Sequence, residues 1–218
     1  MVPFSNDVDI LKYEPALFGE LHLPWQVLAG GTGAVLSGTT LTADDADFKA
    51  AGVLAGGVVY LTSADGSLDG AYEIVSADSA TQLTVSVVRS NMSDAAIAPP
   101  AAEDVSYRIS TFAPQAGEAG FQLTEYFGIQ PGCPTSTIAA EDILDTEGLR
   151  RASVLSVIAG AYAMWASRRE GEDFWTKSLH YKLLFEKARQ RCRLGIDLGA
   201  DGIADVTSVG GAIRLLRD

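Results

Sequence analysis

EGLRRASVLSVIAGAYAMWASRREGEDFWTKSLHYKLLFEKARQRCR, residues 147–193, contains two consecutive helical patterns. The first pattern, Leu149–Arg169, is apolar almost throughout its middle. The second, Phe174–Arg193, carries one apolar stripe at helical spacing, made of Phe174, Tyr181, Leu184, Phe185, Ala188 and Cys192. Gly171 interrupts the pattern, and Asp173 can cap the helix that follows. The stretch therefore predicts a helical hairpin that carries the core of the protein.

Gly160 lies in the middle of the first pattern, where a glycine costs about 1 kcal/mol relative to alanine. Its neighbours on both sides are alanines, which favours the close approach of another element at this point. Trp165 and Trp175 flank the predicted turn, and packing is the simplest explanation for both.

The second helical pattern is strongly basic. Its cations are Lys177, Lys182, Lys187, Arg189, Arg191 and Arg193. Such a surface can contact an acidic protein surface or nucleic acid, or it can remain a solvated charged face. The basic face carries no aromatic residues and no known nucleic-acid-binding motif, which disfavours nucleic acid.

Residues 30–112 differ from the rest of the chain, because glycine, serine, threonine and aspartate increase while lysine and arginine nearly vanish. Strand signals follow one another with turn signals between them. They are Val35–Thr42, Val58–Thr62, Ala71–Ser76, Gln82–Val88 and the alternating residues Val105, Tyr107 and Ile109. Leu83, Val85 and Val87 share one face of the fourth stretch. Five or six short antiparallel strands of this kind predict a small barrel or sandwich.

Two polar stretches of this region have local explanations. The glycine-rich stretch 30–33 lacks the Lys-Ser/Thr of a phosphate-binding loop, so we interpret it as an ordinary loop. Asp44, Asp45 and Asp47 could hold a metal, but they also suit the start of a single helical turn that Gly52 stops.

The remaining segments complete an α+β fold. Residues 1–29 predict an N-terminal arm with one short helix that packs with the helical domain. Residues 113–195 form that domain and begin with a connector over 113–146, in which Phe121–Phe127 is a short helix or a strand and residues 139–144 are a helix. Residues 196–218 form a C-terminal extension. The expected fold is thus a C-terminal helical hairpin or bundle with an inserted small antiparallel β-barrel or sandwich over residues 30–112 and a C-terminal tail.

The formal net charge of −12 is unevenly distributed. Residues 1–149 hold four basic and 20 acidic residues, a net charge of −16, whereas residues 150–218 hold 12 basic and eight acidic residues, a net charge of +4. Halves of opposite sign can supply the two complementary faces that a head-to-tail contact between identical subunits requires.

Targeting and membrane signals are not evident. No apolar run follows a basic N-terminal segment, so we expect no signal peptide. The longest apolar-rich run, Val154–Ala166, is shorter than the roughly 20 residues that span a membrane.

The sequence identifies no catalytic site. His22 and His180 are the only histidines, and neither has a nucleophile motif nearby. Cys133 and Cys192 lie far apart and form no metal-ligand pattern. A nucleophile built from one of these cysteines and a histidine stays an alternative, but Cys192 lies on the apolar stripe and is better explained as core.

Asp197, Asp201 and Asp205 match three ligand positions of a calcium-binding loop. Gly199 and Ser208 stand where two further ligands are required. A tight turn that redirects the chain explains these residues better. We therefore predict no metal, no cofactor and no catalytic residue.

Several segments together resemble the head–tail adaptor (connector) proteins of tailed bacteriophages. They are the short acidic N-terminal helix, the long alanine-rich helix, the basic helix with Tyr181-Lys182-Leu183-Leu184-Phe185, and the C-terminal extension. The β-region, with the segments 48–53 (FKAAGV) and 70–75 (GAYEIV), is similar to β-modules inserted in phage virion proteins. The likeness covers most of the chain.

The resemblance implies a structural virion protein rather than an enzyme. The family forms a homo-oligomeric ring, usually of twelve copies, that is assembled in the host cytoplasm and bound beneath the portal at the head–tail junction. The expected partners are other copies of the chain, the portal protein and tail proteins, and DNA passes through the channel without sequence-specific binding. The resemblance assigns portal docking to Ile213, Arg214, Leu215, Leu216 and Arg217, and subunit or portal contacts to the basic helix 174–193.

Two other functions stay open. One is another phage structural protein, such as a tail-completion or decoration protein. The other is a hydrolase that uses the acidic β-domain, which would need converging carboxylates and a cleft.

Overall fold

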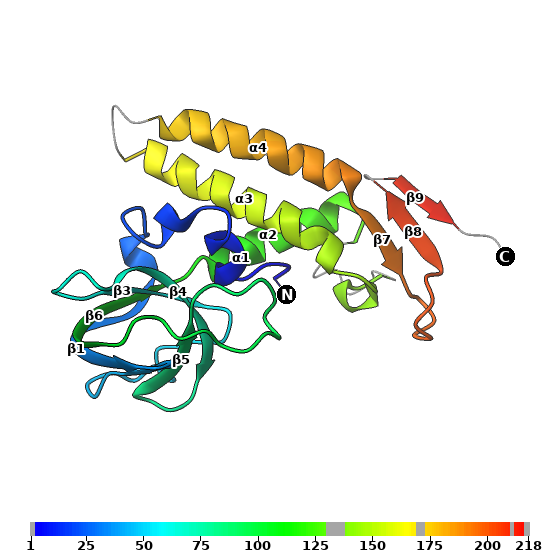
Figure 1. The fold of residues 1–218 in the computed structure, drawn as a ribbon. Helices are drawn as coiled ribbons and strands as arrows, with labels where there is room; N and C mark the ends of the chain where they lie inside the picture. Colours follow the sequence, from blue (N-terminus) through cyan, green and yellow to red (C-terminus); the bar gives the residue numbers. More distant parts are fainter. Residues whose placement is uncertain (1–2, 130–137, 169–172, 210–211, 216–218) are drawn as a thin grey trace. The chain divides into compact units, whose positions relative to one another are not determined.

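The computed structural model describes residues 3–129, 138–168, 173–209 and 212–215. The chain divides into two compact units. The barrel unit is Asn6–Phe112, and the helical unit consists of Met1–Ser5 together with Ala113–Asp218 (Figure 1). The predicted α+β class is confirmed.

The barrel unit contains a closed antiparallel barrel with the strand order β1-β2-β5-β4-β3-β6. Its strands are β1 (Val27–Ser37), β2 (Thr40–Thr42), β3 (Val58–Thr62), β4 (Asp69–Ala77), β5 (Gln82–Ser86) and β6 (Ala102–Ser110). Closure pairs the first strand with the last, so that this barrel leaves neither of them as a free edge. Of the two predicted β architectures, the chain therefore adopts the barrel.

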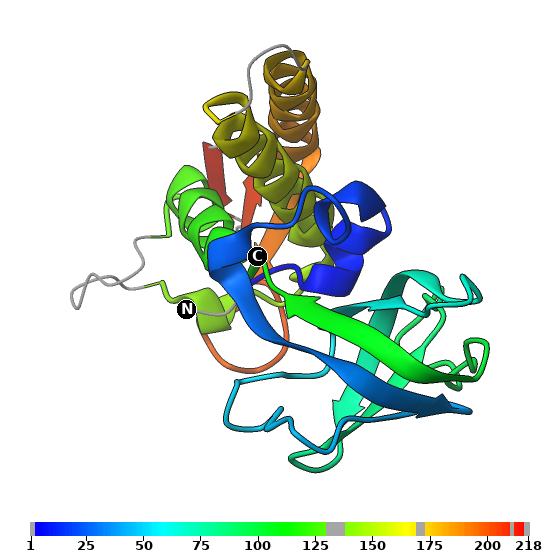
Figure 2. The ribbon, with the colours of Figure 1, turned by 90° about the vertical axis from the view of Figure 1, so that its left-hand side faces the viewer.

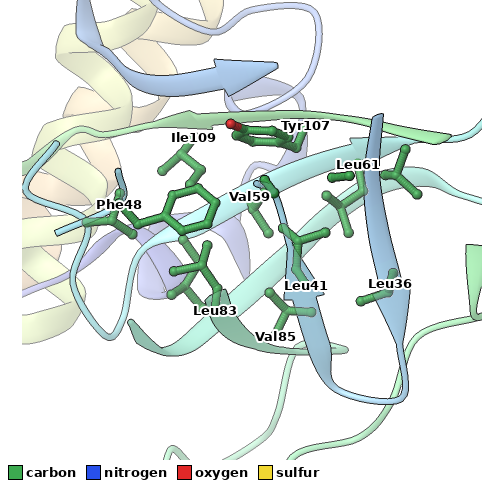
Figure 3. Close-up of a cluster of buried hydrophobic side chains, with 14 of the residues drawn as sticks. Leu36, Leu41, Phe48, Val59, Leu61, Leu83, Val85, Tyr107 and Ile109 are labelled. Carbon is green, nitrogen blue, oxygen red and sulfur yellow. The ribbon is translucent and has the colours of Figure 1, made fainter. Parts of the chain in front are cut away.

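The barrel interior is filled by side chains that alternate along the strands. Figure 3 shows Leu36, Leu41, Val59, Leu83 and Val85 among the buried residues of this cluster. Phe48 comes from the turn after β2 and packs edge-to-face against Tyr107, with the ring centroids 5.7 Å apart. The predicted inner face of β5 is right for Leu83 and Val85, but strand β5 ends at Ser86 and Val87 is 40% exposed.

Strand β1 contains the glycine-rich stretch that the sequence predicted as a loop. That prediction is wrong, because residues 30–33 pair with β6 through Gly30 and Gly31. The pairing register shifts between Gly31 and Ala34, and Gly33 has a φ of 76°, which favours glycine. A Cβ on Gly31 would lie 3.0 Å from the Tyr107 ring, so the absence of a side chain at this position leaves room for the ring.

The sequence associated residues 1–29 with the helical domain, and this is wrong for residues 6–29, which belong to the barrel unit. Phe4 and Ser5 do belong to the helical unit, where Phe4 lies in the core. The segment before β1 contains three short helices. It holds α1 (Asp7–Leu11) and the short helices η1 (Pro15–Leu17) and η2 (Pro24–Gln26). Helix α1 starts with a capping box formed by Asn6 and Asp9. The backbone N–H of Val8 donates to the Gly56 carbonyl, and Arg108 of β6 donates to the carbonyls of Phe18 and Gly19. These bonds hold residues 6–26 to the barrel.

The helical unit is built on α2 (Ala113–Tyr126), α3 (Glu147–Ala166) and α4 (Phe174–Arg191). Helices α3 and α4 lie side by side (Figure 1, Figure 2), and the Ser178 hydroxyl donates to the Ala159 carbonyl between them. The sequence left Phe121–Phe127 open as a short helix or a strand. The segment is helical and belongs to α2, which begins eight residues earlier, at Ala113. The helix predicted over residues 139–144 is a single turn, η3 (Ala140–Asp142).

The C-terminal segment forms a three-stranded antiparallel sheet with the order β7-β8-β9. Its strands are β7 (Arg193–Ile196), β8 (Val206–Val209) and β9 (Ala212–Leu215). The sequence predicted a C-terminal extension over residues 196–218 and no strands within it. Leu194 and Ile196 are fully buried, and Leu194 belongs to the core of the helical unit. Ile196 pairs with Ile143 in an isolated bridge.

Candidate interaction surface on the helical unit

Helix α4 buries a narrow line of side chains, Phe174, Ser178 and Phe185. In contrast, Trp175, Leu179 and Leu183 are 58%, 44% and 56% exposed. Residues four positions apart share one face of a helix, so these three residues form a single exposed apolar stripe, which we call the α4 stripe. The interpretation of Trp175 as a packing residue is therefore wrong, whereas Trp165 is buried as expected.

A groove of about 410 Å³ lies between α2, α3 and α4 and shares residues with the α4 stripe. Small residues of α3 leave room for the groove, while α4 lines it with apolar side chains and α2 lines it with polar ones. The lining includes Gly160, Ala163, Trp175, Leu179, Glu118 and Gln122. Such a concave surface with mixed walls suits an inserted side chain or short segment of a partner.

Gly160 explains why the groove is open at α3. The sequence predicted that this glycine permits the close approach of a neighbouring element. In the part of the chain that the structure describes, a Cβ at Gly160 meets no atom within 4 Å. The prediction is thus wrong for neighbours within the chain, because Gly160 faces the groove instead of a packed element.

Two of the six predicted contact residues are held by aromatic rings of their own unit. The Lys177 ammonium donates to the Tyr162 hydroxyl at 3.2 Å and lies over the Tyr162 ring. The Arg189 guanidinium lies over the Tyr126 ring, 4.0 Å from its centroid. A third, Lys182, lines the groove. These residues stabilise or border the surface rather than forming one charged cluster.

The other three predicted cations meet at a second pocket, of about 300 Å³, which we call the basic pocket. Lys187 and Arg191 come from α4, Arg193 from β7, and Arg151 from α3. Arg151 could not be predicted as a member of this group, because its position in the first helical pattern does not show that it lines a pocket with the end of the second helix. The pocket collects positive charge from three elements.

These four cations have no acidic partner among the residues with described positions. The ion pairs Arg89–Glu73 and Arg150–Glu147 both lie outside the basic pocket. Like charges that converge without a counter-charge repel one another. The basic pocket is therefore chemically suited to an anionic group from outside the helical unit.

Cys192 forms part of the wall of the basic pocket and belongs to the core, as predicted. Its Sγ donates to the carbonyls of Gly148 and Ala188, and burial raises the pKa of the Cys192 thiol. A raised pKa disfavours the thiolate that a nucleophile needs. His22 lies in the barrel unit and His180 on α4, and Cys133 lies outside the described residues.

The calcium-like loop between β7 and β8 is a backbone turn. The Asp197 carboxylate accepts from the N–H groups of Asp201 and Gly202, and Asp205 accepts from those of Leu198 and Gly199. The carboxylates that would bind a cation thus accept hydrogen bonds from backbone N–H groups of the loop, as the turn interpretation expects. Across the described ranges, no group of three or more histidine, cysteine or acidic side chains could hold a metal ion.

The predicted portal-docking residues divide between two situations. Ile213, Arg214 and Leu215 belong to strand β9, whose backbone pairs with β8. Leu216 and Arg217 lie outside the described residues.

No helix in the described ranges is long and apolar enough to cross a membrane. Comparison of the chain with protein-family models, with curated proteins and with solved structures found no match.

Proposed function

We propose that this protein is a structural head–tail adaptor of a tailed bacteriophage. Copies of the chain form a ring, of twelve subunits as is usual in the family it resembles, between the portal and the tail around the DNA channel. The role is one of assembly, without catalysis, and its place is the head–tail junction of the virion.

The observation that carries the proposal is the outward face of α4. Three large apolar side chains lie exposed in one line there, beside the groove and the basic pocket. Aromatic and apolar anchors with a polar rim are the composition of a protein–protein interface. A helix that buries only three residues in its own chain gains further burial when a partner covers this face.

The charge distribution supports contacts between unlike faces of identical subunits. The barrel unit holds 14 acidic and four basic residues, whereas four cations gather on the helical unit. Contacts between unlike faces generate a ring when the rotation closes. An acidic channel wall would also let DNA slide without adhering.

Sedimentation velocity of the full chain tests the role of the α4 stripe. We expect the wild-type protein to form an oligomer and the Leu179→Ser/Leu183→Ser variant to sediment as a smaller species. The matched control is Leu54→Ser/Ile203→Ser, which removes two exposed apolar side chains, 73% and 68% exposed, that lie off the stripe. Equal dissociation of both variants would contradict a specific role of α4.

Portal docking is tested separately by co-sedimentation with the portal protein. A chain that ends at Ala212 should still self-assemble but should no longer co-sediment with portal. Retention of portal binding by this shortened chain would contradict docking through residues 213–217.

A further inference from the structure

The basic pocket needs a counter-charge that the helical unit does not provide. Arg151, Lys187, Arg191 and Arg193 surround one pocket and have no hydrogen bond or ion pair to a carboxylate in the described part of the chain. Three of the four are arginines, whose planar guanidinium groups match carboxylates in a bidentate manner. The preferred ligand is therefore an oxyanion, and a cluster of carboxylates suits the cluster of cations.

The chain itself carries a large excess of carboxylates on its barrel unit, which has a net charge of −10. Several carboxylates at the turns and strand ends of this unit already accept hydrogen bonds within it. The Asp65 carboxylate accepts from the Ser63 hydroxyl and the Ser67 backbone N–H. The Asp69 carboxylate accepts from the Tyr60 hydroxyl. The Asp78 carboxylate accepts from the hydroxyls of Ser76 and Thr84.

The turn Asp44–Asp47 differs, because it presents three exposed carboxylates within four residues. Asp47 accepts from the Ala50 N–H, whereas the described residues offer Asp44 and Asp45 neither a hydrogen bond nor an ion pair. Within the described ranges these carboxylates do not belong to a metal site either. Their charge is available to a partner.

This turn is also rigid. Phe48 directly after it is fully buried in the barrel, and the Phe48 N–H donates to the Ala80 carbonyl at 2.7 Å. The Ala46 N–H donates to Ala43, whose own N–H donates to Thr81. A rigid acidic turn loses little conformational entropy when it enters a pocket, which favours it as a binding element.

We infer that the basic pocket of one subunit receives the acidic turn Asp44–Asp47 of a neighbouring copy. This inference rests on the proposed ring, because it names the charged contact by which one copy would recognise the next. The pocket lies on the helical unit and the turn on the barrel unit, so the contact joins unlike surfaces and can repeat around a closed ring. The basic helix carries no known nucleic-acid-binding motif, which favours this protein ligand over a phosphate backbone.

Charge reversal on each side tests the contact, with self-association of the full chain measured by sedimentation velocity at low ionic strength. Arg151→Glu/Arg191→Glu and Asp44→Lys/Asp45→Lys should each weaken association at least about tenfold, as expected for the loss of close charge pairs. A chain that carries all four substitutions should recover association, because the charges are exchanged across the same contact.

Two control variants change the net charge equally. Arg150→Glu/Arg168→Glu alters two exposed cations of the helical unit outside the basic pocket, and Glu103→Lys/Asp104→Lys alters another exposed acidic pair of the barrel unit. Both should associate like the wild type.

The outcomes separate the two proposals. A wild-type chain that stays monomeric would overturn the ring itself. Two results would contradict this contact without contradicting the ring. One is a ring that persists in Arg151→Glu/Arg191→Glu, and the other is a chain with all four substitutions that stays dissociated. Loss of binding to a labelled DNA duplex in Arg151→Glu/Arg191→Glu, with unchanged assembly, would assign the pocket to nucleic acid and also overturn the inference.

Discussion

The Asp7 carboxylate accepts a hydrogen bond of 2.7 Å from the backbone N–H of Phe112, 105 residues later in the chain. The two residues lie at the two ends of the barrel unit, Asn6–Phe112. This bond therefore closes the unit where the chain enters and leaves it, as an inserted domain requires.

Asp7 should make the stability of the barrel unit depend on pH. Burial raises the pKa of Asp7 from 3.8 to about 6, although hydrogen bonds from Phe112 and Thr111 oppose the shift. The folded state then holds the proton more tightly than the unfolded state, so stability falls as the pH rises from about 4 to about 6. Asp7→Asn keeps an oxygen acceptor without the charge and should stabilise the protein by about 2–3 kcal/mol above that range.

Urea unfolding at a series of pH values measures this effect. The control is Glu103→Gln, which replaces an exposed carboxylate of the barrel unit outside the proposed contact and should keep the pH slope of the wild type. An Asp7→Asn protein with the same pH slope as the wild type would contradict the raised pKa.

A buried ion pair holds strand β4 to the segment after β5. Glu73 and Arg89 have side chains only 1% and 5% exposed, and Arg89 Nη2 lies 2.6 Å from Glu73 Oε1. Arg89→Met leaves the carboxylate buried and unpaired, which should cost about 3–5 kcal/mol of unfolding free energy. The double variant Glu73→Leu/Arg89→Met removes both charges and should recover much of this loss. Chemical denaturation compares the two, and equal losses in both would show that packing rather than charge is responsible.

Two substitutions at Gly160 should affect the stability of the fold and the assembly of the subunits separately. Gly160→Ala should raise the unfolding free energy of the isolated subunit by about 0.5–1 kcal/mol, because no atom of the described chain obstructs the new methyl group. Gly160→Leu should fill part of the groove and weaken self-association. Thermal unfolding and sedimentation velocity measure the two quantities, and a Gly160→Leu protein that assembles like the wild type would contradict occupation of the groove by a neighbour.

The stability of the β7–β8 loop should depend on its carboxylates and not on a bound cation. Asp197→Ala leaves two backbone N–H groups without their acceptor and should cost about 1–3 kcal/mol. Glu125→Ala, an exposed carboxylate on α2, serves as the control. The melting temperature should fall in the first variant alone and should not respond to a chelator in the wild type. A chelator-dependent melting temperature would restore the calcium interpretation.

The barrel could be predicted from the sequence because its strands alternate between core and surface. The predicted strand Val58–Thr62 has the observed bounds, and its neighbours are marked by tight turns. The first part of helix α2 could not, since Gly117 and Gly120 lower helix propensity. The burial of Ala119 and Leu123 stabilises it instead, and that burial is visible only in three dimensions.

The C-terminal sheet escaped prediction because each of its strands has four residues, too few for a periodic pattern. The candidate surface was predictable in part. The cations of α4 are plain in the sequence, but the partners that hold Lys177 and Arg189 are not. Trp165 and Trp175 both flank the predicted turn of the hairpin, and only the packing of α3 and α4 buries one and exposes the other.

Native mass spectrometry of the purified full chain tests self-assembly most directly. We predict a single closed oligomer of the 23.0 kDa subunit, with twelve copies, that dissociates in the Leu179→Ser/Leu183→Ser variant. A wild-type protein that remains a 23.0 kDa monomer under conditions of low ionic strength and high concentration would contradict the ring.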